Sequence, residues 1–503
     1  MRKADPCILV IFGASGDLTA RKLIPALYEM HTLGNLPEAF RVLGVSRRAK
    51  TDEQWRDELA ASVQQHATRW DAVRWRDFSQ SIEYFAGDAA QPQMYAVLGQ
   101  RLAAIDATAG TRGNRLFYLS VAPELYEPIV QRIDEAALVT EGRRWCSVDA
   151  STRSWQRIIV EKPFGHDEAS AASLNRALGR VFDEEDIYRI DHYLGKEVVQ
   201  AMLVLRFANT MFEPVWNHQY IDHIQISASE MVGVGNRTSF YDQTGAIRDM
   251  IQSHLLQIFA FAAMEPPTSI AAEEIRAEKI KVVRALRPTE AQDVQSHAAL
   301  GQYAVSSEEN AYVDLDGIAK GSATETFAAL KLYVDNWRWA GTPFYLRTGK
   351  RMAAKRTEVV VQFKRPAADL FHDIPHAAGG VRGNRLVIEI APMQRTMLRF
   401  ETKVPGTPLR MDSVEMQADL DKRFGVAAVE AYGPLLVDAM RGDQSLYKHR
   451  IEVESGWSAV MPFLGAESAD LRSGIASNYQ QGSWGPAAAD DLMRRDGRTW
   501  HNG

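Results

Sequence analysis

The sequence predicts an α/β domain built on a doubly wound parallel sheet, followed by a larger α+β domain built on a mostly antiparallel sheet. Over residues 1–190, short apolar runs alternate with helical stretches, which is typical of a parallel sheet covered by helices. The first of these runs leads directly into a glycine-containing turn and a helix. Over residues 191–503, strand-forming stretches partly alternate between apolar and polar side chains, which favours an antiparallel sheet with one exposed or partner-covered face. We therefore expect two domains, 1–190 and 191–503.

The composition excludes several classes of protein. The chain has 503 residues, 46% hydrophobic and 24% charged, as in an ordinary globular protein of two or three domains. Its net charge of −6 offers no general basic surface for nucleic acid. Two cysteines without a Cys-x-x-Cys pair do not make a disulfide scaffold or a structural zinc site, and they fit a reducing cytosol.

Membrane insertion and secretion are also not expected. The longest apolar run, near Leu255–Met264, is too short to span a bilayer, and the N-terminus lacks the pattern of a signal peptide. We expect a cytoplasmic protein that binds a small molecule and no nucleic acid, membrane or metal ion.

The first predicted strand, Cys7–Phe12, is a continuous apolar run, as in a strand buried on both faces. It is followed by Gly13-Ala14-Ser15-Gly16-Asp17-Leu18 and by a helical stretch over 20–30. Strand, glycine turn and helix form the frame of a Rossmann-like dinucleotide site, where a pyrophosphate lies against the helix N-terminus. The glycine spacing is not the usual one, so a tight turn without a ligand is the alternative.

The next predicted strand, Arg41–Ser46, ends in Arg47 and Arg48. An acidic residue at this place selects NAD, whereas arginine accommodates the 2′-phosphate of NADP, so we expect NADP. A solvated basic turn is the alternative. Further strands of the same sheet are expected at Ile82–Gly87, Arg115–Leu119 and Arg157–Val160.

The last of these strands is followed by Glu161-Lys162-Pro163-Phe164-Gly165. A lysine at the carboxyl end of a parallel strand lies where ligands bind, and the proline is a candidate for a cis bond. A plain turn is the alternative.

The polar stretch Arg189-Ile190-Asp191-His192-Tyr193-Leu194-Gly195-Lys196-Glu197 stands at the expected boundary between the domains. His192, Tyr193 and Lys196 offer an imidazole, a hydroxyl and an ammonium, a set of donors that suits a phosphate. Because ligand sites favour such boundaries, we expect a phosphate-bearing substrate here. A solvated polar loop is the alternative.

In the second domain, strands are expected at Ile221–Ser229, Glu358–Lys364, Arg385–Ile390 and Thr396–Thr402, and a helix at Ala246–Met264. His254 lies on the apolar stripe of that helix, where a histidine that only packs in the core is the alternative to a functional one. Asp249, five residues earlier, would be about 140° away around an α-helix, so the two would share no strict face. A basic cluster, Arg347, Lys350, Arg351, Lys355 and Arg356, is either a solvated turn or half of an anion clamp.

Five stretches together resemble the glucose-6-phosphate dehydrogenase family, nearly from end to end. They are Gly13 to Leu18, Glu161 to Gly165, Arg189 to Glu197, Ile247-Arg248-Asp249-Met250-Ile251-Gln252-Ser253-His254-Leu255-Leu256-Gln257, and Gly482-Ser483-Trp484-Gly485-Pro486. The resemblance implies an NADP-dependent enzyme that oxidises C1 of glucose 6-phosphate to 6-phosphogluconolactone, the first oxidative step of the pentose phosphate pathway. It also implies a homodimer or homotetramer.

The resemblance further implies roles for single residues. His254 would remove the proton of the C1 hydroxyl, and Asp191 would hydrogen-bond the other imidazole nitrogen. The hydride would pass to C4 of the nicotinamide. The resemblance implies that His192, Tyr193 and Lys196 bind the sugar phosphate, and that Glu230, Asp249 and Lys350 bind the hexose, with Lys355 as a second basic position. It implies that Lys162 contacts both substrate and cofactor. It also implies that Gly13 to Leu18, together with Arg47, bind the cofactor.

Two departures from the family keep related substrates open. Thr238-Ser239 stands where the family has a glycine pair, and Ala391 stands where it often has a glutamine. The alternatives are an NAD(P)-dependent C1 dehydrogenase of a related sugar or phosphosugar, such as an amino sugar or an epimer, and a non-catalytic NADP-binding regulator. NAD in place of NADP is also open.

Overall fold

A computed structural model describes residues 3–139, 154–191, 197–307, 309–376, 380–406, 408–425 and 431–502. The chain forms two compact units. Unit 1 contains residues 1–195, 269–276 and 428–454, and unit 2 contains residues 196–268, 277–427 and 455–503. Unit 1 is therefore built from three separate parts of the chain. The domain division after residue 190 stays a prediction.

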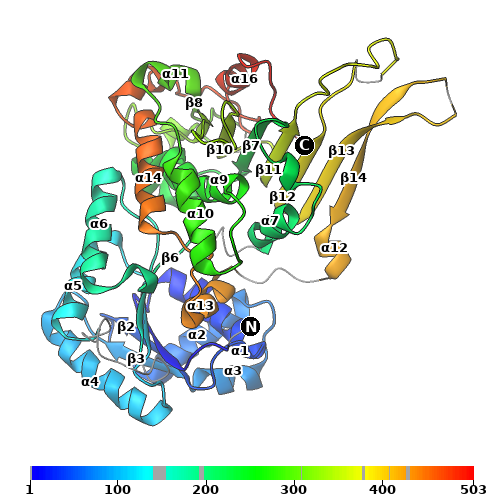
Figure 1. The fold of residues 1–503 in the computed structure, drawn as a ribbon. Coiled ribbons are helices and arrows are strands. Elements are labelled where there is room, and N and C mark those ends of the chain that lie inside the picture. The colour runs from blue at the N-terminus through cyan, green and yellow to red at the C-terminus, as the bar shows by residue number, and fades with distance from the viewer. Residues whose placement is uncertain are drawn as a thin grey trace. The chain divides into compact units, whose positions relative to one another are not determined.

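Within the described residues, the sheet of unit 1 has six strands, all parallel, in the order β3-β2-β1-β4-β5-β6 (Figure 1). This order is that of the doubly wound dinucleotide-binding fold, so the predicted class is confirmed. The strands are β1 (Cys7–Phe12), β2 (Phe40–Ser46), β3 (Ile82–Ala86), β4 (Arg115–Leu119), β5 (Gln156–Val160) and β6 (Ile187–Arg189). Every residue of β1 is buried, as its continuous apolar run predicts.

Helices connect these strands. A π-helical stretch (Thr19–Leu23) leads into α1 (Ile24–Thr32) after β1. The Thr51 side chain accepts from the N–H of Gln54, and the Gln54 side chain accepts from the N–H of Thr51, so this pair forms a capping box that begins α2. The other helices are α2 (Asp52–His66), α3 (Ala72–Ser79), α4 (Pro92–Ala109), α5 (Tyr126–Glu135), α6 (Glu168–Val181) and α13 (Tyr432–Arg441).

Unit 2 contains an eight-stranded sheet in the part of the chain that the structure describes, in the order β14-β13-β12-β11-β7-β10-β9-β8. All neighbouring strands are antiparallel except β7 and β10, so a mostly antiparallel sheet is confirmed. Figure 1 shows β13 and β14 as a long hairpin that extends beyond the other strands of this sheet. The strands are β7 (Ile221–Ser229), β8 (Ala298–Gly301), β9 (Phe327–Leu332), β10 (Phe344–Gly349), β11 (Arg356–Phe363), β12 (Arg385–Ala391), β13 (Arg395–Lys403) and β14 (Met411–Asp419).

The long helix expected at Ala246–Met264 is present, but its first half is a π-helix, η7 (Ile247–Leu255), followed by α9 (Leu256–Ala263). None of the helices in the described ranges is both long and apolar enough to cross a membrane. The remaining α-helices are α7 (Glu197–Phe207), α8 (Thr238–Ala246), α10 (Ala272–Arg284), α11 (Val294–His297), α12 (Leu420–Phe424), α14 (Arg450–Val460), α15 (Ala469–Arg472) and α16 (Ala487–Arg494).

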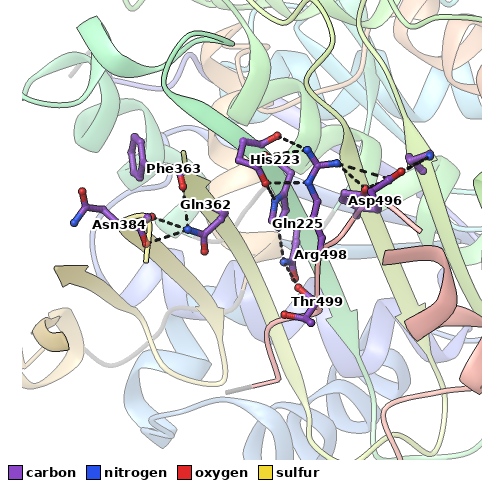
Figure 2. Close-up of polar contacts among 12 residues, drawn as sticks. His223, Gln225, Gln362, Phe363, Asn384, Asp496, Arg498 and Thr499 are labelled. Atoms are coloured by element: carbon purple, nitrogen blue, oxygen red, sulfur yellow. Dashed lines mark hydrogen bonds and ion pairs between the residues drawn. The ribbon is translucent and has the colours of Figure 1, made fainter. Parts of the chain in front are cut away.

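The C-terminal segment, residues 496–502, packs on the sheet of unit 2 (Figure 2). Arg498 donates from Nε to Asp222 Oδ2 at 2.9 Å. Gln225 donates to the carbonyl of Thr499 at 3.0 Å and accepts from the N–H of His501 at 2.8 Å. Side chains of β7 therefore form hydrogen bonds with residues more than 270 positions later in the chain.

Candidate active site

The glycine turn after β1 has a geometry that requires glycine at position 13. Gly13 has φ of 88°, and a Cβ there would lie 1.9 Å from the carbonyl oxygen of Ser120. The N–H of Gly13 donates to the carbonyl of Val45 at 3.0 Å, and the N–H of Gly16 donates to Gly13 at 2.9 Å. The turn is thus held against the carboxyl ends of β2 and β4, where doubly wound sheets bind their ligands.

The rest of the turn completes a cradle for a pyrophosphate. Ala14 is buried beneath it, and Ser15 Oγ lies 2.7 Å from Ser46 Oγ. The helix begins at Asp17 and Leu18, so its N-terminal N–H groups follow the glycine turn directly. A helix N-terminus in this position favours an anion.

Arg47 is exposed at the end of β2, as the NADP prediction requires. Its neighbour Arg48 is also exposed, and the Arg48 carbonyl accepts from the Tyr84 hydroxyl at 2.7 Å. No carboxylate follows β2 directly, because Ser46, Arg47 and Arg48 occupy those positions. The site therefore offers positive charge where the 2′-phosphate of NADP would lie.

Lys162 follows β5 and precedes a cis peptide bond to Pro163, so the prediction of a cis proline is confirmed. The preceding residue, Glu161, anchors this turn. Its carboxylate accepts from the Tyr118 hydroxyl at 2.5 Å, and its carbonyl accepts from the Tyr126 hydroxyl at 3.1 Å. Burial raises the pKa of the Glu161 carboxyl, against the lowering effect of the Tyr118 hydrogen bond. Lys162 is thus carried by a fixed turn at the ligand-binding edge of the sheet.

Asp191 follows β6 and is 3% exposed. Its Oδ2 lies 3.4 Å from Nζ of Lys448, whose side chain is only 2% exposed. Sequence reasoning missed Lys448, because its partner is more than 250 residues away and no motif surrounds it. His192, Tyr193 and Lys196 lie outside the described residues.

In unit 2, the π-helix changes the relation between Asp249 and His254. A π-helix hydrogen-bonds residues five apart, as the N–H of Leu256 does with the carbonyl of Ile251. Asp249 and His254 are also five apart, slightly more than one turn of a π-helix, so they lie on roughly the same side of the helix. The expectation of about 140° was wrong because it assumed an α-helix. His254 is 1% exposed.

Glu230 and Lys350 form an ion pair at the ends of β7 and β10. The two strands are parallel neighbours, and the N–H of Glu230 donates to the carbonyl of Gly349 at 3.0 Å. Lys350 is 6% exposed, so its ammonium has little water around it and is compensated by the Glu230 carboxylate. The pair presents a carboxylate and an ammonium, which are suitable groups for sugar hydroxyls.

The side chain of Tyr241, a residue that the sequence analysis did not predict, lies beside Lys350. The Lys350 ammonium lies 5.7 Å from the centroid of its ring. Its hydroxyl is buried and forms no hydrogen bond within the part of the chain that the structure describes. Burial raises its pKa well above the ordinary value, and the nearby carboxylates of Asp249 and Glu230 act in the same direction. Because buried hydroxyl groups usually have a hydrogen-bond partner, this hydroxyl beside three proposed hexose-binding residues is a further candidate for hexose binding.

Most of the basic cluster before β11 has structural partners in unit 2. These partners are Trp484, Trp500 and His501 for Arg347, Glu309 for Arg351, and Glu358 for Arg356. Lys355 is exposed. Arg347, Arg351 and Arg356 therefore have partners in unit 2, as Lys350 has in Glu230. Whether the cluster also binds an anion stays a prediction, and Lys350 and Lys355 are its proposed substrate residues.

The positions at which the sequence departs from the family pattern also lie in unit 2. Thr238 and Ser239 begin α8, where a hydroxyl residue replaces each of the expected glycines. Ala391 ends β12 and precedes a second cis proline. Its methyl side chain can neither donate nor accept a hydrogen bond.

These residues include the kinds of group that a dehydrogenase needs, and their roles stay predictions. Unit 1 offers a pyrophosphate cradle, an arginine for a 2′-phosphate and a buried carboxylate. Unit 2 offers a buried histidine with an acid one turn away, an ammonium–carboxylate pair and an unsatisfied phenol. Such a set suits proton removal from a hydroxyl group with hydride transfer to a nicotinamide.

Comparison with known proteins agrees with this set. Two family models match, the glucose-6-phosphate dehydrogenase NAD binding domain over residues 10–201 and the glucose-6-phosphate dehydrogenase C-terminal domain over residues 203–501. The glucose-6-phosphate 1-dehydrogenases of Aggregatibacter actinomycetemcomitans and Mycolicibacterium smegmatis are each 41% identical, over 99% of this chain and 98% of theirs.

Solved structures agree over the same length. A glucose-6-phosphate dehydrogenase in complex with its substrate glucose-6-phosphate is similar with a TM-score of 0.88 and 31% identity, covering 100% of both chains. The glucose-6-phosphate 1-dehydrogenase from Mycobacterium avium has a TM-score of 0.84 and 31% identity, covering 100% of this chain and 99% of that one.

Proposed function

The chain belongs to the glucose-6-phosphate dehydrogenase family, and from this premise we propose which of its residues carry out the reaction. It is an NADP-dependent dehydrogenase that oxidises C1 of glucose 6-phosphate to 6-phosphogluconolactone, the first oxidative step of the pentose phosphate pathway. The observation that carries this conclusion is the match of both family models, which together span residues 10–201 and 203–501.

The proposed base is His254. Its imidazole takes the proton of the C1 hydroxyl, and the hydride leaves the same carbon. Bound NADP supplies the hydride acceptor at nicotinamide C4. Asp191 accepts from the other imidazole nitrogen, which selects the tautomer and stabilises the imidazolium that forms.

The cofactor site is proposed at the turn Gly13 to Leu18 with Arg47 and Lys162. The support is the close approach at Gly13, where a side chain would collide with Ser120, and the exposed arginine after β2. Arg47 pairs with the 2′-phosphate.

The substrate site is proposed to divide between two sets of residues. His192, Tyr193 and Lys196 bind the sugar phosphate, and Glu230, Asp249 and Lys350 bind the hexose, with Lys355 as a second basic position. The ion pair of Glu230 and Lys350 supports the second set. Lys162 contacts the substrate near the cofactor.

The first experiment is the initial rate of nicotinamide reduction with glucose 6-phosphate, with NADP and NAD compared at equal concentrations. We expect turnover with a higher kcat/KM for NADP. Equal kcat/KM for NAD would contradict the role of Arg47 and leave the reaction intact. Free glucose is the control, because a kcat/KM equal to that of the phosphorylated sugar would contradict a phosphate site.

A second candidate substrate is favoured by one observation, the lack of a hydrogen-bonding side chain at Ala391. A site that loses one polar contact discriminates less strongly among sugars. Glucosamine 6-phosphate and galactose 6-phosphate are therefore the comparison substrates. A higher kcat/KM for either would move the assignment to an amino sugar or an epimer.

Partners and location are proposed in the same way. We expect a homodimer or homotetramer in the cytoplasm, without nucleic-acid or membrane partners, in agreement with the net charge of −6 and two cysteines. Light scattering on the purified protein measures the number of subunits.

A further inference from the structure

We propose that Lys448 is a positioning residue for the reaction, because its ammonium holds the carboxylate of Asp191 in one orientation. This inference rests on the proposed role of Asp191. The Lys448 Nζ and Asp191 Oδ2 atoms are 3.4 Å apart, and both side chains are only 2% exposed. In such surroundings neither charge has water to replace its partner, so each fixes the other.

The backbone of Lys448 is attached to the strand that leads to Asp191. The N–H of Lys448 donates to the carbonyl of Arg189 at 3.2 Å, and Arg189 Nη1 donates to the carbonyl of Lys448 at 3.4 Å. Gln444 Nε2 donates to the carbonyl of Ile187 at 2.9 Å. The segment 444–448 therefore runs beside β6, and the cation and the carboxylate are carried by paired backbone.

Hydrogen bonds also hold the side chain of Arg189, so the backbone of β6 beside residues 444–448 is rigid. Its guanidinium donates to both oxygens of Glu184, at 2.6 and 3.1 Å, and to Asn175 Oδ1 at 3.1 Å. Arg189 is fully buried. A buried bidentate pair of this kind leaves little freedom to the strand that carries it.

Lys448 also lies beside the turn that carries Lys162. Its Nζ is 5.7 Å from the ring centroid of Phe164, two residues after Lys162. The charged groups that act on it are Asp191, Glu452 and Lys162. Burial lowers the pKa of Lys448, the repulsion from Lys162 acts in the same direction, and the two carboxylates oppose it. Lys448 therefore connects two parts of the proposed site.

The expected chemical consequence has two parts. When an ammonium holds one oxygen of a carboxylate, the other oxygen points in a fixed direction. The imidazole that bonds to this second oxygen is then held in the orientation that the reaction needs. By the proposed role of Asp191, its carboxylate lies between the Lys448 ammonium and the base, so the ammonium would add positive charge to the surroundings of the imidazolium that forms. Since a like charge disfavours the charged form, Lys448 keeps the base neutral at lower pH.

The test is Lys448→Met, which removes the charge and keeps the length of the side chain. We expect kcat to fall about tenfold. We also expect the acidic limb of the kcat/KM profile to move up by roughly 0.5–1 pH unit, because the pKa of the base rises. KM for NADP should stay within about twofold. Lys448→Arg keeps the cation and should restore the position of the acidic limb.

A double-mutant cycle with Asp191→Asn keeps the test decisive if Lys448→Met alone folds poorly. When both charges are removed together, the core no longer holds an uncompensated charge. The double variant should then be no slower than Asp191→Asn alone. Effects on kcat that multiply would overturn the proposal, and so would an acidic limb that Lys448→Met leaves in place.

Lys331→Met is the matched control. Lys331 is a similarly buried lysine, 3.2 Å from Asp496 in unit 2, and it belongs to no part of the proposed site. It should lower stability and leave the acidic limb unchanged. The wild-type rate on glucose 6-phosphate tests the proposed function separately. If Asp191→Asn itself keeps the wild-type rate, the role of Asp191 fails and the proposal fails with it.

Discussion

At the scale of single residues, burial distinguishes the proposed chemical groups from ordinary surface charges. His254 is 1% exposed, Asp191 3% and Lys350 6%. Buried ionisable groups cost folding free energy unless they are paired, so they contribute little to stability. His254 and Lys350 are such groups in unit 2, and Asp191 is one in unit 1. Burial of ionisable groups is typical of sites where protons or charged ligands are handled.

The role of His254 predicts a selective loss in His254→Asn. Asparagine cannot accept the proton, so kcat should fall by about 10²–10⁴-fold while KM for NADP changes little. Steady-state kinetics at the pH optimum measure this effect. His297→Asn, at a histidine of α11 outside the site, is the control and should keep its kcat. A His254→Asn variant with turnover near that of the wild type would falsify the assignment of the base.

Arg47 is predicted to set the cofactor preference. Arg47→Met removes a charge-assisted hydrogen bond worth about 1.5–3 kcal/mol, so KM for NADP should rise roughly 10–100-fold. KM for NAD, which has no 2′-phosphate, should stay near its wild-type value. Arg69→Met replaces another exposed arginine of unit 1 and should leave both values unchanged. A parallel rise for NAD would show that Arg47 supports the fold instead.

Tyr241 is predicted to bind the hexose through its hydroxyl. Tyr241→Phe should raise KM for glucose 6-phosphate about 2–10-fold, the usual value of one neutral hydrogen bond, and leave KM for NADP unchanged. Tyr303→Phe changes another tyrosine of the same hydrophobic cluster and serves as the control. If Tyr241→Phe leaves KM for the sugar phosphate unaltered, the hydroxyl contributes no binding.

At the scale of elements, the π-helix η7 explains how Asp249 and His254 come to share a face. The apolar positions of this stretch recur at a spacing that an α-helix also satisfies, so sequence periodicity does not distinguish the two. Only the hydrogen bonds between residues five apart reveal it. A π-helix is rare in general and is frequent at functional sites.

The sequence predicted the strands best where apolar runs are bounded by turns. β1, β4 and β7 have the predicted limits, and β2 and β5 differ by one residue. β9 and β10 were not predicted, because they are fully buried and show no alternation, and unlike in β1 a charged residue, Lys331 or Arg347, interrupts the apolar run. Lys448 and Tyr241 were missed for another reason: their importance depends on partners that are distant in the chain.

The turn after β1 predicts a large effect of Gly13→Ala. The added methyl group would meet Ser120 and the backbone has a positive φ, so we expect KM for NADP to rise at least tenfold and the thermal midpoint to fall. Gly34→Ala is a close control, since Gly34 has φ of 70° and open space around it. It should lower the thermal midpoint slightly and leave KM for NADP intact. Equal effects of the two variants would indicate backbone strain alone.

At the scale of the whole molecule, ion pairs join the C-terminal segment to the sheet of unit 2. Asp222 accepts from Arg498 at 2.9 Å and pairs with His223 at 2.6 Å (Figure 2). Burial acts to raise the pKa of the Asp222 carboxyl, but the hydrogen bonds from His223 and Arg498 outweigh it and hold the pKa below its ordinary value. The charged form is therefore favoured by folding.

This depressed pKa predicts how stability changes with pH. The contribution of Asp222 is present above the pKa of the unfolded chain, about 3.9, and is lost as pH falls below it. The thermal midpoint of the wild type should exceed that of Asp222→Asn at pH 6, and the difference should shrink towards pH 3. Scanning calorimetry of both proteins measures it. Asp335→Asn, at an exposed ion pair with Arg287, should show a smaller difference at pH 6.

The order of the chain has a consequence for its synthesis. Residues 428–454 belong to unit 1 with residues 1–195, and β7 is bonded to residues 498–501. At about 5–20 residues per second, the first segment of unit 1 waits roughly 15–50 s on the ribosome before its last segment emerges. The strands of both sheets have been made by residue 419, but α13 and residues 444–448 of unit 1 and the C-terminal segment of unit 2 follow later. Until residues 444–448 have been made, the edge of β6 lacks their hydrogen bonds and is open to pairing with another strand.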